Sequence, residues 1–272
     1  MIVRTIPSSG ELLNVIGLGT WQTFDTDSDA YPALQKVLET LHGAGGRLID
    51  SSPMYGRAEK VIGDITSVLP ARNDFFYATK VWTTGLQEGI RQMEASLHKL
   101  QRDTIDLMQI HNLVDWKIHL PVLQHWKEAG RIRYVGITHY RDGSHQQLED
   151  IIRREKPDFA QFNYSILSRH AEERLLPAAA DNGVATIINR PFGEGTLFRK
   201  VAGKPLPTWA GALGIKSWAG FFLKFILSHP AVTCVIPATG NPAHAADNVA
   251  AGTEPLPDEA TRIKMAAYVE RL

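Results

Sequence analysis

The feature that most constrains the fold is a regular alternation of short apolar runs with longer amphipathic segments. Eight runs rich in Val, Ile, Leu and Phe are expected to form strands, at 14–19, 47–52, 75–82, 105–111, 134–139, 159–164, 184–190 and 232–238. Most lack strict polar–apolar alternation, which is typical of strands that helices cover on the outside. The pattern predicts a parallel α/β fold, and the count of eight favours a closed (β/α)8 TIM barrel over an open sheet.

In the segments between these runs, apolar residues have the spacing that is typical of helices. Apolar side chains recur every three or four residues within 86–100 and again within 146–154, as on helices that pack against a core. Asn241 and Pro242 resemble an N-cap and a first-turn proline, and so predict the start of another helix. We therefore expect a helix after most of the strands.

Two segments stand outside this alternation. The opening residues MIVRTIPSSGELL are expected to form a β-hairpin that turns at Ser8-Ser9-Gly10 and caps the bottom of the barrel. The segment from Gly193 to about Trp209 is rich in glycine and proline, and we expect a long loop that covers a ligand. Because α/β barrels of this length fold as single units, residues 1–272 are expected to form one domain.

The amino-acid composition limits the classes of partner that we expect this chain to bind. Lys plus Arg number 29 and Asp plus Glu number 29, so no basic excess indicates nucleic acid or an anionic membrane. No apolar stretch approaches the roughly 20 residues of a membrane span, and the N-terminus lacks a signal-peptide segment. The one cysteine, Cys234, is expected in a buried strand, and no zinc cluster is apparent. We expect a cytoplasmic protein, a monomer or weak oligomer, with a small-molecule partner and no metal.

Polar side chains of complementary chemistry follow the expected strands. Asp50 lies at the end of the second strand and Tyr55 follows it, Lys80 lies in the third, and His111 ends the fourth. Barrels place their active sites at these carboxyl ends. A nearby ammonium lowers the pKa of a tyrosine, and a buried ammonium needs a carboxylate partner. With an imidazole to orient a carbonyl oxygen, the set suits the protonation of an oxygen that becomes negative.

Each of the four has a simpler interpretation. Asp50 could cap a loop, Tyr55 could be a packing aromatic, and His111 could be a core histidine. Lys80 is harder to explain in this way, because it interrupts the apolar run FYATKVW and lysines are rarely buried for packing. The convergence of all four on one end of a barrel favours catalysis.

The chain also resembles the aldo-keto reductases. The matching segments occur in family order and span roughly the whole sequence: GLGTW at 17–21, LIDSSPMYG at 48–56, ATKV at 78–81, IDLMQIH at 105–111, VGI at 135–137, QFNY at 161–164, and IP, NP and DN at 236–237, 241–242 and 247–248. The resemblance implies a (β/α)8 barrel that binds NADPH or NADH without a Rossmann fold. It implies Tyr55 as proton donor, tuned by Asp50 and Lys80, with His111 orienting the carbonyl. In agreement, the glycines at 17–19 lack the third glycine of a dinucleotide fingerprint.

The resemblance also implies a cofactor-binding set. Contacts to the carboxamide of the nicotinamide are expected from Thr138, His139 and Gln161. Other contacts to the cofactor are expected from Gly19, Thr20, Trp21, Asp50, Asn189, Arg190, Pro191, Phe192, Gly193 and Gly195. Contacts to its adenosine end are expected from Thr239, Gly240, Asn241, His244, Asp247 and Asn248.

Some of these positions depart from the family pattern. Thr138-His139 stands where Ser-Asn is frequent, and Asn112 stands where a tryptophan often follows the histidine. The aromatic ring that stacks on the nicotinamide is missing at Asn189, so Arg190 could approach the cofactor phosphates, Phe192 could supply packing, or affinity could be weaker.

Cofactor choice is open for a related reason. Family members that prefer NADPH often carry cations at two positions that are Ala238 and His244 here. A histidine is mostly neutral at pH 7. The family favours NADPH, and NADH is possible.

The substrate pocket is expected above the nicotinamide, and its predicted lining comprises Trp21, Phe24, Tyr55, Trp82, His111 and Asn112. Such a lining predicts an aldehyde or ketone with an apolar or aromatic body, in an open, permissive site. Two other functions compete with carbonyl reduction. One is a non-catalytic, cofactor-sensing or regulatory barrel. The other is a metal-dependent hydrolase with Asp50, His111 and His139 as ligands, which would leave Lys80 and Tyr55 unexplained.

Overall fold

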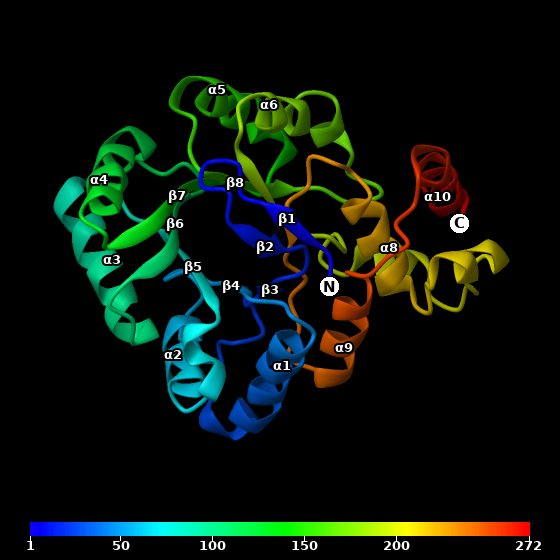
Figure 1. Cartoon of the computed structure of the whole chain (residues 1–272), viewed down its shortest axis with the longest axis horizontal. Coiled ribbons are helices and arrows are strands. Elements are labelled where there is room, and N and C mark those ends of the chain that lie inside the picture. The colour runs from blue at the N-terminus through cyan, green and yellow to red at the C-terminus, as the bar shows by residue number, and fades with distance from the viewer.

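Eight parallel strands form a ring surrounded by helices in the computed structural model, which describes residues 1–272 (Figure 1). The strands are β3 (Leu18–Gly19), β4 (Leu48–Asp50), β5 (Phe76–Val81), β6 (Ile105–His111), β7 (Ile132–Thr138), β8 (Phe159–Asn163), β9 (Ala185–Asn189) and β10 (Cys234–Val235). Strands that follow one another in sequence are neighbours in the sheet. Parallel bridges from Ile16 to Val235 and from Gly19 to Ala238 join its two edges. The predicted (β/α)8 barrel is confirmed.

Ten α-helices alternate with or follow these strands. They are α1 (Tyr31–Gly43), α2 (Ala58–Ser67), α3 (Leu86–Leu100), α4 (Trp116–Glu128), α5 (His145–Glu155), α6 (Leu175–Asp181), α7 (Thr196–Lys200), α8 (Trp218–Leu227), α9 (Pro242–Ala250) and α10 (Glu259–Arg271). The side chain of Asn241 caps α9 by accepting a hydrogen bond from the backbone nitrogen of Ala243 at 2.9 Å, as its sequence predicts. None of the helices combines the length and apolar character that a bilayer span requires.

The strands are buried on both faces, which explains why their sequences do not alternate. A cluster of 61 buried residues lies largely between strands and helices, and a separate cluster of 12 lies mainly inside the ring. The inner cluster contains Phe76, Tyr134 and Phe159, whose rings contact one another with centroids 5.5–6.0 Å apart. The barrel is therefore a packed core, and only its two ends are free to hold other structure.

The predicted N-terminal hairpin is present and lies across one end of the ring (Figure 1). It pairs β1 (Val3–Thr5) with β2 (Leu12–Asn14). Ile6 and Leu13 belong to the inner cluster, and the hydroxyl oxygens of Tyr134 and Ser9 lie 2.7 Å apart. Because the hairpin packs beneath the interior side chains, the carboxyl ends of the strands are left for the chemistry.

Two features differ from the expectations. The first and last barrel strands are shorter than predicted, since β3 and β10 each contain two residues and pair with each other only through isolated bridges. The segment 193–209 is not one long loop, because it contains α7 and the start of a 3₁₀-helix at Thr208–Leu213. Leu197 and Ala210 are buried, and this burial favours helical turns over an open loop.

Candidate active site

The polar residues predicted from the sequence gather at the carboxyl ends of adjacent strands. Asp50 is the last residue of β4, and His111 is the last of β6. Lys80 on β5 lies opposite Gln109 in the strand register, and His111 lies opposite Thr138, the last residue of β7. The parallel register therefore brings together side chains that are far apart in the sequence.

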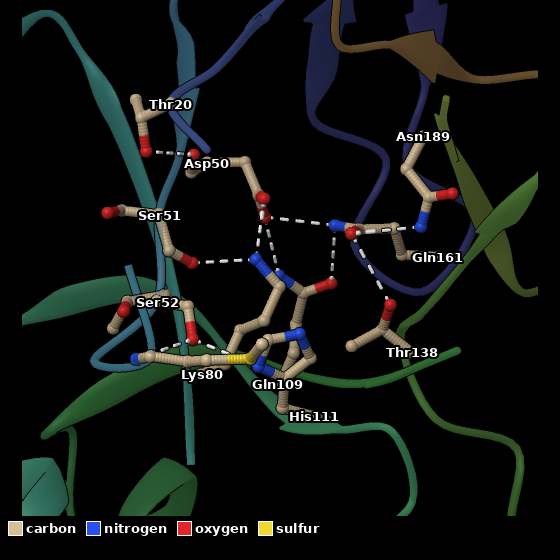
Figure 2. A network of polar contacts seen from close by, with 12 residues as sticks. Thr20, Asp50, Ser51, Ser52, Lys80, Gln109, His111, Thr138, Gln161 and Asn189 are labelled. Atoms are coloured by element: carbon tan, nitrogen blue, oxygen red, sulfur yellow. Dashed lines mark hydrogen bonds and ion pairs between the residues drawn. The ribbon is translucent and has the colours of Figure 1, made fainter. Parts of the chain in front are cut away.

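A buried ion pair lies at the centre of this group. Lys80 Nζ is 2.6 Å from Asp50 Oδ2, and the two side chains are 0% and 3% exposed. The same ammonium donates to the carbonyl oxygen of Ser51 at 2.6 Å (Figure 2). A lone buried charge would be costly, so each member of the pair makes the burial of the other possible.

A network of amides holds the second oxygen of the carboxylate. Asp50 Oδ1 accepts from Gln109 Nε2 at 2.8 Å and from Gln161 Nε2 at 2.9 Å (Figure 2). Gln161 Nε2 also donates to Gln109 Oε1 at 3.1 Å, and Gln161 Oε1 accepts from Thr138 and Asn189 at 3.3 Å each. Sequence reasoning missed Gln109, although a glutamine inside the apolar run IDLMQIH was the available signal.

Tyr55 follows β4 through a short turn and packs beside the ion pair. Its ring meets the His111 ring edge-on, with centroids 5.8 Å apart, and Lys80 Nζ lies 5.1 Å from the Tyr55 ring centre. Burial raises the pKa of Tyr55, and this effect exceeds the opposing influence of Lys80. From the sequence we expected the Lys80 ammonium to give Tyr55 a lowered pKa. The ammonium does act in that direction, but burial outweighs it and the net pKa is raised. The phenol is protonated at neutral pH and is able to donate.

The His111 ring is neutral. Burial is the main cause that lowers the pKa of His111 to about 2, and the neighbouring Lys80 and His139 contribute in the same direction. Ring atom Nδ1 lies 2.9 Å from the Ser52 hydroxyl oxygen. A neutral imidazole that faces a cavity can donate one hydrogen bond to a substrate oxygen.

These groups line a cavity of about 420 Å³. Its wall comprises Gly19, Thr20, Trp21, Gln22, Thr23, Asp50, Met54, Tyr55, His111, Asn112, Thr138, Tyr140, Gln161, Asn189, Arg190, Pro191, Phe192, Glu194, Gly195, Phe198, Ile236 and Ala238. Half of the lining residues are polar or charged, and the others are apolar, aromatic or glycine, so the cavity offers both apolar surface and hydrogen-bonding groups to a small molecule.

Most of the predicted cofactor residues lie on this wall, and a second group lies outside it. Those outside the cavity are His139, Gly193, Thr239, Gly240, Asn241, His244, Asp247 and Asn248. The last six belong to α9 and the turn that precedes it. The structure therefore separates most of the predicted set into a cavity group and an α9 group, whereas His139 and Gly193 belong to neither.

The predicted substrate residues also divide. Trp21, Asn112, Tyr55 and His111 line the cavity. Trp82 is 41% exposed and lies next to the cavity wall, where its ring packs against the His111 ring with centroids 6.4 Å apart.

Phe24 corrects the expectation, since it does not line the cavity. Its side chain is fully buried in the outer hydrophobic cluster. The backbone nitrogen of Phe24 donates to the carbonyl oxygen of Thr20 at 3.1 Å. This turn directs the chain away from the strand end and places the ring in the core.

Tyr140 and Phe198 are cavity residues that the sequence did not single out. The guanidinium of Arg190 lies 4.0 Å from the Tyr140 ring centre and forms an ion pair with Glu194 at 2.8 Å. Arg190 is thus held by protein partners rather than free at the cavity. Tyr140 comes two residues after the end of β7, and its position near a strand end was the only available signal.

The model of the Aldo/keto reductase family matches residues 15–266, and the chain belongs to that family, whose members reduce carbonyl groups with NAD(P)H.

Individual relatives are similar to this chain at moderate identity. The aldo-keto reductase YhdN of Bacillus subtilis is 29% identical over 220 residues, which cover 74% of this chain and 65% of YhdN. The NADH-specific methylglyoxal reductase of Escherichia coli is 29% identical over 243 residues, which cover 76% of this chain and 71% of that protein. The chain thus spans about two thirds of the length of these relatives.

A solved structure shares the fold. An aldo-keto reductase from Klebsiella pneumoniae in complex with NADPH superposes with a TM-score of 0.83 at 23% identity. The alignment covers 99% of this chain and 96% of that one. At this level of identity the likeness shows the architecture alone.

Proposed function

We propose that this protein reduces an aldehyde or ketone to an alcohol with NADPH or NADH, and that Tyr55 is the general acid. The observation that carries the proposal is the Tyr55 ring packed beside a buried Lys80–Asp50 ion pair. Tyr55 and the neutral His111 both line the cavity. Structural packing alone gives no reason to bury an ammonium at this place.

The cavity fits the nicotinamide end of the cofactor. The side-chain oxygen of Asn189 is buried without a hydrogen-bond partner, next to Thr138 and Gln161. A carboxamide carries N–H donors that such an oxygen accepts. When bound, the cofactor supplies the hydride. We propose that the cavity residues hold its nicotinamide half and that the α9 group holds its adenosine half.

The chain's own residues then move one proton. The carbonyl oxygen accepts a hydrogen bond from the His111 ring, which orients the substrate beside Tyr55. The Tyr55 O–H bond breaks, and its proton passes to the oxygen as that atom gains charge. The Lys80 ammonium stabilises the resulting phenolate, and Asp50 keeps Lys80 in place.

Cofactor preference and substrate are proposed from the site together with the relatives. NADPH is our first expectation, and NADH remains possible because Ala238 and His244 offer no permanent cation to a 2′-phosphate. One relative is named as NADH-specific and one neighbour holds NADPH. That relative is named for methylglyoxal, so a small dicarbonyl belongs in the substrate panel beside apolar and aromatic aldehydes.

The experiment is a comparison of wild type with Tyr55→Phe. Fluorescence titration with NADPH and with NADH should give the same Kd for both proteins. Carbonyl reduction by the variant should fall by about 100-fold to 10,000-fold, the range of general acid catalysis. Tyr134→Phe, which removes a phenol at the hairpin end of the barrel, should keep wild-type turnover.

Two results would contradict the proposal. If the wild-type protein bound neither NADPH nor NADH, a reduction that depends on either cofactor would be excluded. Binding with no turnover of any carbonyl compound, unchanged in Tyr55→Phe, would instead favour a cofactor-sensing barrel.

A further inference from the structure

The hydroxyl of Ser52 is buried between the backbone and the His111 ring. Ser52 is 0% exposed, and its oxygen lies 2.9 Å from His111 Nδ1 and 3.2 Å from the backbone nitrogen of Met54 (Figure 2). No hydrogen bond to another protein group is formed by the His111 ring. The histidine therefore has one internal partner, and that partner lies on the side of the ring away from Nε2.

Hydrogen-bond accounting determines which atom donates in each contact. The Met54 N–H can only donate, so the Ser52 oxygen accepts it. The Ser52 hydroxyl has a single hydrogen, and His111 Nδ1 is the one acceptor within reach. If Nδ1 itself carried a hydrogen, the Ser52 hydrogen would be buried without a partner, at a cost that native structures avoid.

We propose that Ser52 is a positioning residue that holds His111 in the tautomer with Nδ1 bare and Nε2 protonated. The Nε2–H then points into the cavity as a donor to the carbonyl oxygen. This inference rests on the proposed function for its use of that oxygen. The opposite tautomer would present a lone pair to the substrate oxygen and repel it.

The charges around the ring are consistent with this role. Lys80 and His139 disfavour a second proton on the imidazole, and burial does so more strongly. A ring that stays neutral has two tautomers of similar chemistry, so an outside partner is needed to select one of them. Ser52 lies between Asp50 and Tyr55 in sequence, on the turn that also places the proton donor.

The direct test is ¹⁵N NMR of protein labelled at histidine, between pH 6 and 8. The chain has 10 histidines, and the spectrum of His111→Gln identifies the His111 signals by their loss. We expect a protonated Nε2 and an unprotonated, hydrogen-bonded Nδ1. A hydrogen on Nδ1 would overturn the proposal. This measurement needs no turnover, so it is independent of the proposed function.

Variants test the consequence for catalysis. Ser52→Ala should lower kcat about tenfold, the equivalent of one ordinary hydrogen bond, and leave the cofactor Kd unchanged. Ser52→Thr keeps a hydroxyl and should restore most of kcat and the wild-type nitrogen shifts. Ser96→Ala removes a buried serine hydroxyl on α3, far along the chain from the site, and controls for lost stability.

The outcomes separate the two proposals. Wild-type kcat and unchanged Nδ1 shifts in Ser52→Ala would exclude a positioning role for Ser52. Absence of reduction by wild type, with the expected tautomer in the spectrum, would overturn the proposed function and leave the tautomer assignment standing.

Discussion

At the scale of single residues, the candidate site depends on one charge pair isolated from water. Lys80 has no exposed surface, and its partners are the Asp50 carboxylate and the Ser51 carbonyl. Gln109 and Gln161 saturate the other carboxylate oxygen. Every polar atom of the pair is therefore satisfied, which is the condition under which a buried ion pair is tolerated.

The pair predicts a specific stability effect. Asp50→Asn leaves the Lys80 charge buried without compensation and should lower the free energy of unfolding by about 3–5 kcal/mol. The double variant Asp50→Asn with Lys80→Met removes the stranded charge and should recover part of that loss. Urea unfolding measures both. If the single and double variants were equally stable, the Lys80 ammonium would not be buried without a partner in Asp50→Asn, and this result would contradict the structure.

At the scale of elements, the hairpin and the strands divide the barrel into two ends with different tasks. The hairpin side chains complete the interior packing at one end, whereas the donors gather at the other. Stability and chemistry are thereby separated along the barrel axis. A change in the hairpin should alter the stability of the fold and leave catalysis unchanged.

Adjacent leucines in β2 test this division. Leu13 is 2% exposed, and Leu13→Ala should cost about 2–5 kcal/mol because it opens a cavity in the core. Leu12 is 61% exposed, and Leu12→Ala should change stability by less than about 0.5 kcal/mol. Activity per folded molecule should stay at the wild-type level in both. A selective loss of kcat in Leu13→Ala would argue against separate ends.

At the scale of the whole molecule, a polar cluster ties the last helices to the barrel. The Tyr164 hydroxyl contacts Glu172 and accepts from Arg262 of α10 at 2.7 Å. The His229 ring packs edge-on against the Tyr164 ring with centroids 6.2 Å apart. The cluster therefore joins residues from β8 onward to the end of the chain.

His229 gives this cluster a pH dependence. Burial, with Arg262 and Arg4 nearby and Glu172 opposing them, lowers the pKa of His229 to about 4 from the usual 6.5. Between these values the unfolded chain binds more protons than the folded one, so stability falls as pH decreases from about 6.5 towards 4. His229→Asn should reduce that slope in urea unfolding series. An identical slope in the variant would assign the effect to other groups.

The sequence by itself determined the barrel and the four candidate catalytic residues. Helix and strand periodicity is a local property, so the extent of α3 and the N-cap of α9 could be read directly. Asp50, Tyr55, Lys80 and His111 could be grouped because a barrel brings all strand ends to one face. Family segments in order added the identity of the fold.

Only the tertiary structure decided how these residues act on one another. The net direction of the Tyr55 pKa depends on burial against the distance to Lys80, and neither quantity is local. The contacts of Gln109 with Asp50 and of Ser52 with His111 join different strands and loops, and Phe24 is buried because its turn faces the core. Residue type sets which chemistry is available, whereas burial and strand register set which groups meet.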